Sequence, residues 1–111
     1  MDFKKKNMKI IIFGAAGAIG NYLTKKYLEN NHEVLLFVKD PRSKRELLKL
    51  LNLDNLDKVI IDHLNIEKKN SIKKKIKKHI FFFRNSDLII NATGDLGEIK
   101  NVLDLDLKKF E

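Results

Sequence analysis

Short apolar runs alternate along the chain with longer segments that carry apolar residues on one helical face. An unbroken apolar run is typical of a strand that is buried on both faces of a parallel sheet. The runs predict strands at 10–13, 34–38, 58–61 and 88–90, and the amphipathic segments predict helices at 19–29, 43–51, 67–80 and 99–110. We therefore expect an α/β fold whose parallel strands are joined by right-handed crossovers, with helices on both faces. The expected sheet is doubly wound, in the order 3-2-1-4, with the fourth strand at an edge.

Side-chain spacing predicts how the first helix faces the sheet and where it ends. Ile19, Leu23 and Tyr27 recur at helical spacing, so we expect them to form one buried stripe. Asn30 and Asn31 follow, and they predict the end of the helix because Asn tolerates a left-handed backbone.

The start of the second helix is also marked in the sequence. Asp40 and Pro41 interrupt the chain after the second strand. Ser43 is then expected to cap the helix, with Glu46 at the capping-box position.

Three glycines at regular spacing join the first strand to the first helix. Gly14 allows a sharp turn, Gly17 allows backbone to approach a ligand, and Gly20 allows the helix to pack closely on the strand. The helix then directs its unpaired N–H groups and positive dipole end toward the turn, which favours a pyrophosphate. We accordingly predict cofactor contacts from Gly14, Ala16, Gly17, Ala18, Ile19 and Gly20. The alternative is a turn that only closes a strand–helix connection.

Length and composition restrict the class of protein. The chain has 111 residues and no cysteine, which indicates one domain (1–111, with 1–7 as a disordered lead), no disulfides and a cytoplasmic location. The three histidines lack the spacing of a zinc site, so no metal is expected. No stretch approaches the roughly 18 apolar residues that span a bilayer, so no membrane partner is expected.

The net charge of +8 is concentrated in the lysine-rich segment 67–80. Ile72, Ile76 and Ile80 are spaced four apart, which predicts a helix with an apolar stripe and a solvated basic face. The run Phe81 to Phe83 is expected to close this helix against the sheet. Nonspecific binding of polyanions follows from the charge, and a basic nucleic-acid-binding protein is a remote alternative.

Four segments together resemble the short-chain dehydrogenase/reductase superfamily, over essentially the whole chain. The resemblance is to its extended and atypical branches, which include sugar-nucleotide epimerases and nitrogen-metabolite-regulator-like NAD(P)-binding proteins. The segments are Gly14-x-x-Gly17-x-x-Gly20, Val38-Lys39-Asp40-Pro41-Arg42-Ser43-Lys44, Ile61-Asp62-His63-Leu64 and Asn91-Ala92-Thr93-Gly94. The resemblance implies a Rossmann-like domain that binds NAD(P).

The same resemblance implies roles for the residues that follow each strand. The acidic residue that contacts adenine in the family aligns with His63, and Asp62 could replace it after a shift of one residue. Asn91, Ala92, Thr93 and Gly94 resemble the turn that borders the cofactor ribose.

Independently, cations after the second strand suit a ribose 2′-phosphate, so Lys39 and Arg42 favour NADP, with NAD as the alternative. Asp40 either reaches the ribose or starts the turn before Pro41.

The resemblance does not supply a catalytic residue. A Tyr-x-x-x-Lys string occurs at Tyr22 and Lys26, but on the first helix, where we expect Tyr22 to pack and Lys26 to be solvated. We therefore expect the N-terminal part of an epimerase-like protein, truncated before its catalytic portion, with the enzyme question open. Its partner would be a second copy or the missing C-terminal segment. The alternative is a noncatalytic NAD(P)H sensor or partner-binding module.

Overall fold

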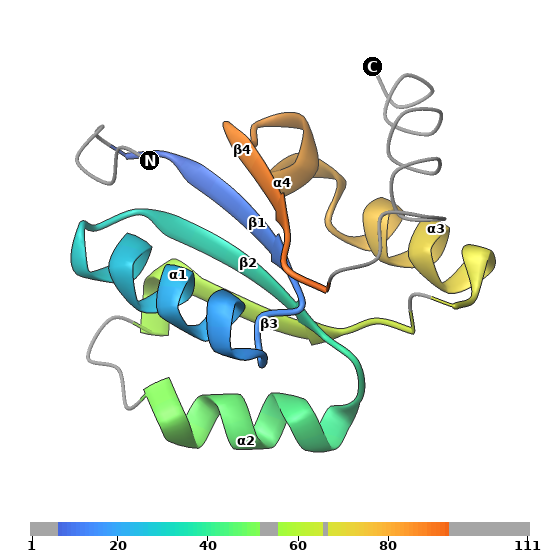
Figure 1. The fold of residues 1–111 in the computed structure, drawn as a ribbon. Coiled ribbons are helices and arrows are strands. Elements are labelled where there is room, and N and C mark those ends of the chain that lie inside the picture. Colours follow the sequence, from blue (N-terminus) through green and yellow to red (C-terminus); the bar gives the residue numbers. More distant parts are fainter. Residues whose placement is uncertain (1–6, 52–55, 66, 94–111) are drawn as a thin grey trace.

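The computed structural model describes residues 7–51, 56–65 and 67–93 (Figure 1). The elements are β1 (Lys9–Phe13), α1 (Ala18–Glu29), β2 (Glu33–Val38), α2 (Pro41–Leu51), the 3₁₀ helix η1 (Leu56–Lys58), β3 (Val59–His63), α3 (Lys69–Lys78), α4 (Ile80–Arg84) and β4 (Leu88–Asn91). The predicted helix 99–110, the lead 1–6 and Gly94 lie outside the described residues. No helix in the described ranges is both long enough and apolar enough to cross a membrane.

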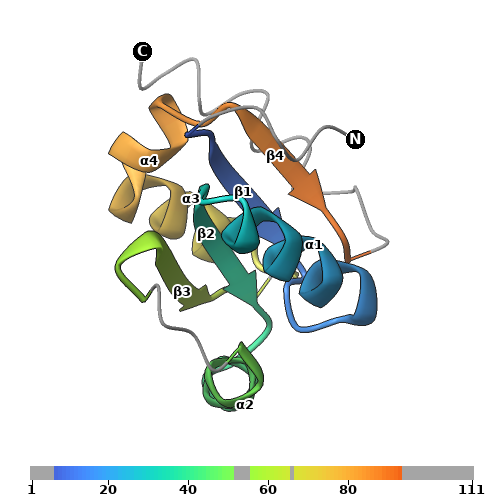
Figure 2. The same ribbon diagram turned by 90° about the vertical axis from the view of Figure 1, so that its left-hand side faces the viewer.

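The four strands form one parallel sheet in the order β3-β2-β1-β4, as the sequence pattern predicts (Figure 2). In the centre of the sheet, Ile11 of β1 pairs with Leu35 of β2 and with Ile89 of β4. Between β2 and β3, Phe37 pairs with Asp62. Because parallel strands share one direction, the segments that follow β1, β2, β3 and β4 all leave the sheet at the same end.

Helices cover both faces of the sheet, which completes a three-layer α/β arrangement (Figure 1). On one face, Leu23 and Tyr27 of α1 and Leu47 of α2 pack in one buried cluster with alternate residues of β1 and β2. On the other face, Ile72 and Ile76 of α3 and Phe83 of α4 pack with the remaining alternate residues. The strands are therefore apolar in unbroken runs because both of their faces are buried.

The orientation of α1 differs from the predicted stripe. Ile19 is 67% exposed, whereas Gly20, Leu23 and Tyr27 are buried. Gly20 faces the backbone at the end of β1, where only a residue without a side chain fits. Because Gly20 must face inward, the preceding residue, Ile19, points outward. Tyr22, expected to pack, is 56% exposed for the same reason. The predicted left-handed residue at the helix end is confirmed at Asn31, whose φ is +64°.

Asp40, not Ser43, begins α2. The Oδ1 atom of Asp40 accepts a hydrogen bond from the backbone N–H of Ser43 at 2.7 Å, and Pro41 occupies the first helical position, where its lack of an N–H costs nothing. The hydrogen bonds from Ser43 lower the pKa of Asp40. Glu46, predicted to complete a capping box, instead accepts from the Nε of Arg42 at 3.2 Å.

The lysine-rich segment forms two helices and not one. The chain breaks at His79, whose backbone lies outside the helical region (φ −109°, ψ 31°), so α3 ends at Lys78 and α4 begins at Ile80. The break turns Phe83 into the buried cluster but leaves Phe81 76% exposed, contrary to the expected packing of all three phenylalanines. The predicted apolar stripe is confirmed, because Ile72 and Ile76 are buried and Ile80 packs against the same cluster.

Candidate functional site

The turn after β1 fits tightly against two other strand ends. Gly14 has a φ of +79°, a conformation that residues with a side chain rarely adopt. A Cβ atom at Gly14 would lie 2.9 Å from the backbone of Ala92 and Thr93. The N–H of Gly14 donates to the carbonyl of Phe37 at 3.0 Å. Glycine is therefore required here by both conformation and space, as the sequence predicts.

The other two glycines differ from each other in their surroundings. A Cβ atom at Gly20 would collide with the Gly14 carbonyl and lie 2.8 Å from the Cα of Ala15, so Gly20 allows the close helix–strand contact that was predicted. A Cβ atom at Gly17 would meet only the Gly14 carbonyl oxygen, at 3.5 Å. The backbone at Gly17 is extended, with φ −73° and ψ 169°. Gly17 is thus needed neither for the turn nor for packing, and the space beside it is open.

The N-terminus of α1 is uncapped. Gly17 occupies the capping position, no side chain in the described ranges caps the helix, and the first turn contains no acidic residue. The first N–H groups of a helix have no intrahelical partners, and they carry the positive end of the helix dipole. The turn therefore presents an electropositive set of donors, which is suited to an anion such as a phosphate.

A cavity of about 390 Å³ lies at the same end of the sheet, beside this turn. Its lining comes from the ends of β1 and β2 and from the segments that follow all four strands: Phe13, Gly14, Phe37, Val38, Lys39, Asp40, Leu64, Asn65, Glu67 and Thr93. Crevices at the carboxyl ends of parallel strands are the usual ligand sites of open α/β sheets. The sequence predictions included Gly14, Lys39 and Thr93 but missed Asn65 and Glu67, which no family motif marks.

Of the two cations predicted to contact a ribose 2′-phosphate, only one lines the cavity. Lys39 is exposed and lines the cavity. Arg42 does not line it; its side chain is 82% exposed and pairs with Glu46 in the first turns of α2. Asp40 lines the cavity while it caps α2, so the predicted turn role is confirmed.

The turn after β4 is fixed by its own polar groups. The N–H of Ala92 donates to the carbonyl of Phe13 at 2.8 Å. Asn91 accepts through Oδ1 from both the N–H and the hydroxyl group of Thr93. These contacts hold the loop against Gly14 and place Thr93 at the cavity.

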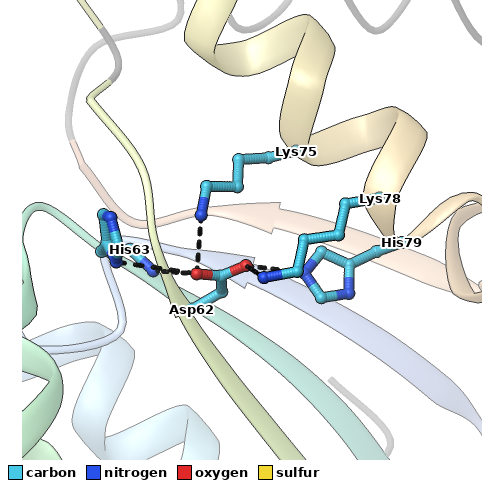
Figure 3. A network of polar contacts seen from close by, with 5 residues as sticks. All are labelled: Asp62, His63, Lys75, Lys78 and His79. Carbon is cyan, nitrogen blue, oxygen red and sulfur yellow. Dashed lines mark hydrogen bonds and ion pairs between the residues drawn. The ribbon is translucent and has the colours of Figure 1, made fainter.

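Asp62 lies in a polar cluster on the α3 face of the sheet (Figure 3), and it is not among the residues that line the cavity. Its Oδ1 accepts from the Nζ of Lys75 at 2.8 Å, and its Oδ2 lies 3.0 Å from the Nζ of Lys78 and 2.8 Å from the Nε2 of His79. The side chain of Asp62 is 6% exposed and that of Lys75 is 18% exposed. These contacts tie α3 to β3, so part of the predicted solvated basic face is engaged in structure.

The cluster sets the protonation state of Asp62. Burial by itself raises the pKa of this carboxyl, but the hydrogen bonds from Lys75, His79 and Lys78, together with the backbone N–H of His63, outweigh it and hold the pKa well below its usual range. Asp62 is therefore ionised at neutral pH. Both of its oxygens are engaged in these contacts, and neither Asp62 nor His63 lines the cavity. The Nδ1 of His63 lies 3.7 Å from the Oδ1 of Asp62.

The Tyr-x-x-x-Lys string lies on α1, outside the cavity lining. The Nζ of Lys26 is 5.8 Å from the centroid of the Tyr22 ring and also pairs with Glu29 at 3.7 Å. Both side chains are thus part of the surface of α1.

A glycine turn that feeds an uncapped helix at the carboxyl end of a 3-2-1-4 parallel sheet defines a Rossmann-like α/β protein. The profile of the NAD dependent epimerase/dehydratase family matches residues 10–102, and the chain belongs to this family. This confirms the resemblance to short-chain dehydrogenases/reductases. No curated protein matches the sequence significantly.

Solved structures of oxidoreductases share the fold. The oxidoreductase yciK from E. coli superposes with a TM-score of 0.70 at 16% identity, over 87% of this chain and 41% of that one. Gre2 from Candida albicans, in complex with NADPH, gives 0.62 at 24% identity, over 76% and 23%. An oxidoreductase of Haemophilus influenza with bound NAD gives 0.65 at 24% identity, over 80% and 31%. The chain thus spans less than half the length of these structures, and identities this low show the fold alone.

We predict that Asp62→Asn destabilises the protein by about 3 kcal/mol at neutral pH, because Lys75 loses a buried counter-charge and His79 loses a hydrogen-bond partner. The pKa of Asp62 is lowered on folding, so its stabilising contribution is complete above the unfolded pKa of about 4 and is lost as the pH falls toward the folded value. Urea denaturation at a series of pH values from neutral to acidic measures the free energy of unfolding of the wild-type and Asp62→Asn proteins. The difference between these two free energies should become smaller as the pH falls.

Glu29→Gln is the matched control. It removes an exposed ion pair with Lys26, so its effect should stay below about 0.5 kcal/mol. An Asp62→Asn protein as stable as this control would contradict a structural role for the cluster.

Proposed function

We propose that this chain binds a nicotinamide dinucleotide, with the pyrophosphate over the N-terminus of α1. The observation that carries the proposal is the uncapped first turn of α1, which follows a glycine turn whose Gly14 lines the cavity at the carboxyl end of the sheet. Donors fixed by a helix and a glycine turn can contact phosphate oxygens without reorganisation. Membership in a family of NAD-dependent proteins supports the same ligand, as do fold neighbours described with bound NADPH or NAD.

NADP is the proposed form of the cofactor. Lys39 lines the cavity directly after β2, where the ribose 2′ position is read in dinucleotide sites. A cation there can form charge-assisted hydrogen bonds with a 2′-phosphate. Asp40 is the nearest acid, but its Oδ1 is engaged with the N–H of Ser43, which reduces its availability to a ribose hydroxyl group. Arg42 lies on the next turn and adds positive charge at longer range.

We predict that the chain binds NADPH more tightly than NADH, and that Lys39→Ala reduces this preference by about fivefold through loss of one phosphate contact. Fluorescence titration of both cofactors at near-physiological salt measures the ratio. Lys25→Ala, which removes an equal charge from the exposed surface of α1, is the control and should leave the ratio unchanged. Equal, weak binding that disappears with added salt would indicate only attraction to the net charge.

We predict that Gly17→Val abolishes dinucleotide binding while the chain stays folded. The extended backbone at Gly17 accepts a side chain without strain, and the nearest atom to its Cβ is at 3.5 Å, so the fold tolerates valine. The isopropyl group would occupy the space proposed for the pyrophosphate. Circular dichroism and a titration on the same sample separate the two effects. A folded variant with unchanged affinity would exclude a phosphate from this turn.

We infer that this chain binds dinucleotide without turnover. Proton transfer requires a donor within hydrogen-bond reach of the substrate, but within the described ranges the Tyr-x-x-x-Lys string lies on the surface of α1. We expect no cofactor oxidation when the chain and NADPH are incubated with a panel of aldehydes and ketones. Turnover that is lost in Tyr22→Phe would contradict this inference.

A further inference from the structure

The residues expected to contact the adenine do not lie at the cavity. Asp62 uses both carboxylate oxygens for α3 and is buried on that face. His63 follows it in β3 and does not line the cavity. If a dinucleotide binds here, the edge of its base is therefore read by other groups. The loop after β3 places two polar residues at the cavity instead, Asn65 and Glu67.

The apolar part of the cavity indicates where the base lies. Val38 and Leu64 both line it, each is only 2% exposed, and the N–H of Leu64 donates to the carbonyl of Val38 at 2.7 Å. This bond joins the end of β2 to the segment after β3. The side chains of Val38 and Leu64 then provide the apolar contacts for a flat ring. Asn65 follows Leu64 directly, so the polar pair lies beside this apolar surface.

The hydrogen bonding of the loop fixes what each side chain can offer. The Oδ1 of Asn65 accepts from the backbone N–H of Glu67 at 3.0 Å. Its Nδ2 is thereby defined as a donor, and within the part of the chain that the structure describes it donates to no protein group. Glu67 is exposed, and among the described residues no cation pairs with its carboxylate, so the same loop also brings an acceptor to the cavity.

A donor and an anionic acceptor from one loop match the polar edge of adenine, which has an N6 amine that donates and an N1 that accepts. We propose that Glu67 accepts from the N6 amine and that Asn65 donates to N1, so that this pair makes the site specific for an adenine dinucleotide. This assignment rests on the proposed function and deepens it. Hypoxanthine reverses both groups, since its 6-oxo group accepts and its N1 carries a proton. It would place an oxygen against the carboxylate and a donor against the Nδ2 group.

The test compares NADPH with its deaminated analogue, reduced nicotinamide hypoxanthine dinucleotide phosphate, by titration at fixed salt. The wild-type chain should bind NADPH about tenfold more tightly, a typical discrimination for one charge-assisted hydrogen bond at a partly exposed site. Glu67→Gln should narrow the ratio to about twofold, because an amide can turn either its oxygen or its NH₂ group toward the base. Glu29→Gln, at the far end of α1, is the control for loss of one negative charge and should keep the wild-type ratio.

The outcomes separate the two proposals. Equal affinity of the wild-type chain for both dinucleotides, or an unchanged ratio in Glu67→Gln, would overturn the adenine assignment and leave the proposed function standing. Failure of the wild-type chain to bind either dinucleotide would contradict the proposed function and the assignment with it.

Discussion

The contact between the start of α1 and the end of β1 is the constraint on which the site depends. Gly14 reverses the chain at a positive φ within 2.9 Å of the loop after β4, measured from the Cβ position that glycine lacks. Gly20 then allows the first turn of α1 to pack against the backbone of Gly14 and Ala15. Side chains at these positions would force α1 away from the sheet. Because neither position carries a side chain, α1 begins close to the end of β1, and Gly14 of the same turn lines the cavity.

The close contact also determines the orientation of α1. Because Gly20 must face the sheet, Leu23, Tyr27 and Leu28 follow it into the core, and Ile19 is turned to the surface near the turn. The strand ends themselves are held together by backbone bonds, from Gly14 to Phe37 and from Ala92 to Phe13. Two sides of the cavity are therefore fixed by backbone hydrogen bonds between neighbouring strand ends.

A second constraint acts on the opposite face of the sheet. The helix α3 carries so many lysines that its attachment to β3 requires an acceptor as well as the apolar contacts of Ile72 and Ile76. Asp62 supplies it, and both of its carboxylate oxygens are engaged in these contacts (Figure 3). Asp62 was the predicted substitute for the acidic residue that aligns with His63, and the structure gives it a packing role instead, while Asn65 and Glu67 line the cavity.

Sequence pattern predicted the sheet order and the roles of Gly14 and Gly20, because buried parallel strands and glycine turns are local signals. It placed Ile19 wrongly, since a spacing of four residues fits two orientations of a helix and only the contact at Gly20 distinguishes them. The prediction of Ser43 as the cap of the second helix was wrong, because Pro41 fits the first helical position and the helix therefore begins at Pro41, with Asp40 as its cap. The partners of Asp62 are 13 to 17 residues away on another element, so no local pattern could reveal them.

The central claim is that a dinucleotide binds through the amides at the start of α1 and not through the general positive charge. Backbone ¹H–¹⁵N NMR during titration with NADPH tests it directly, because each amide reports its own surroundings. The account predicts saturable shifts that are largest at Gly14, Gly17, Ala18 and Ile19. Shifts confined to the lysines of α3, growing without saturation and removed by salt, would contradict it.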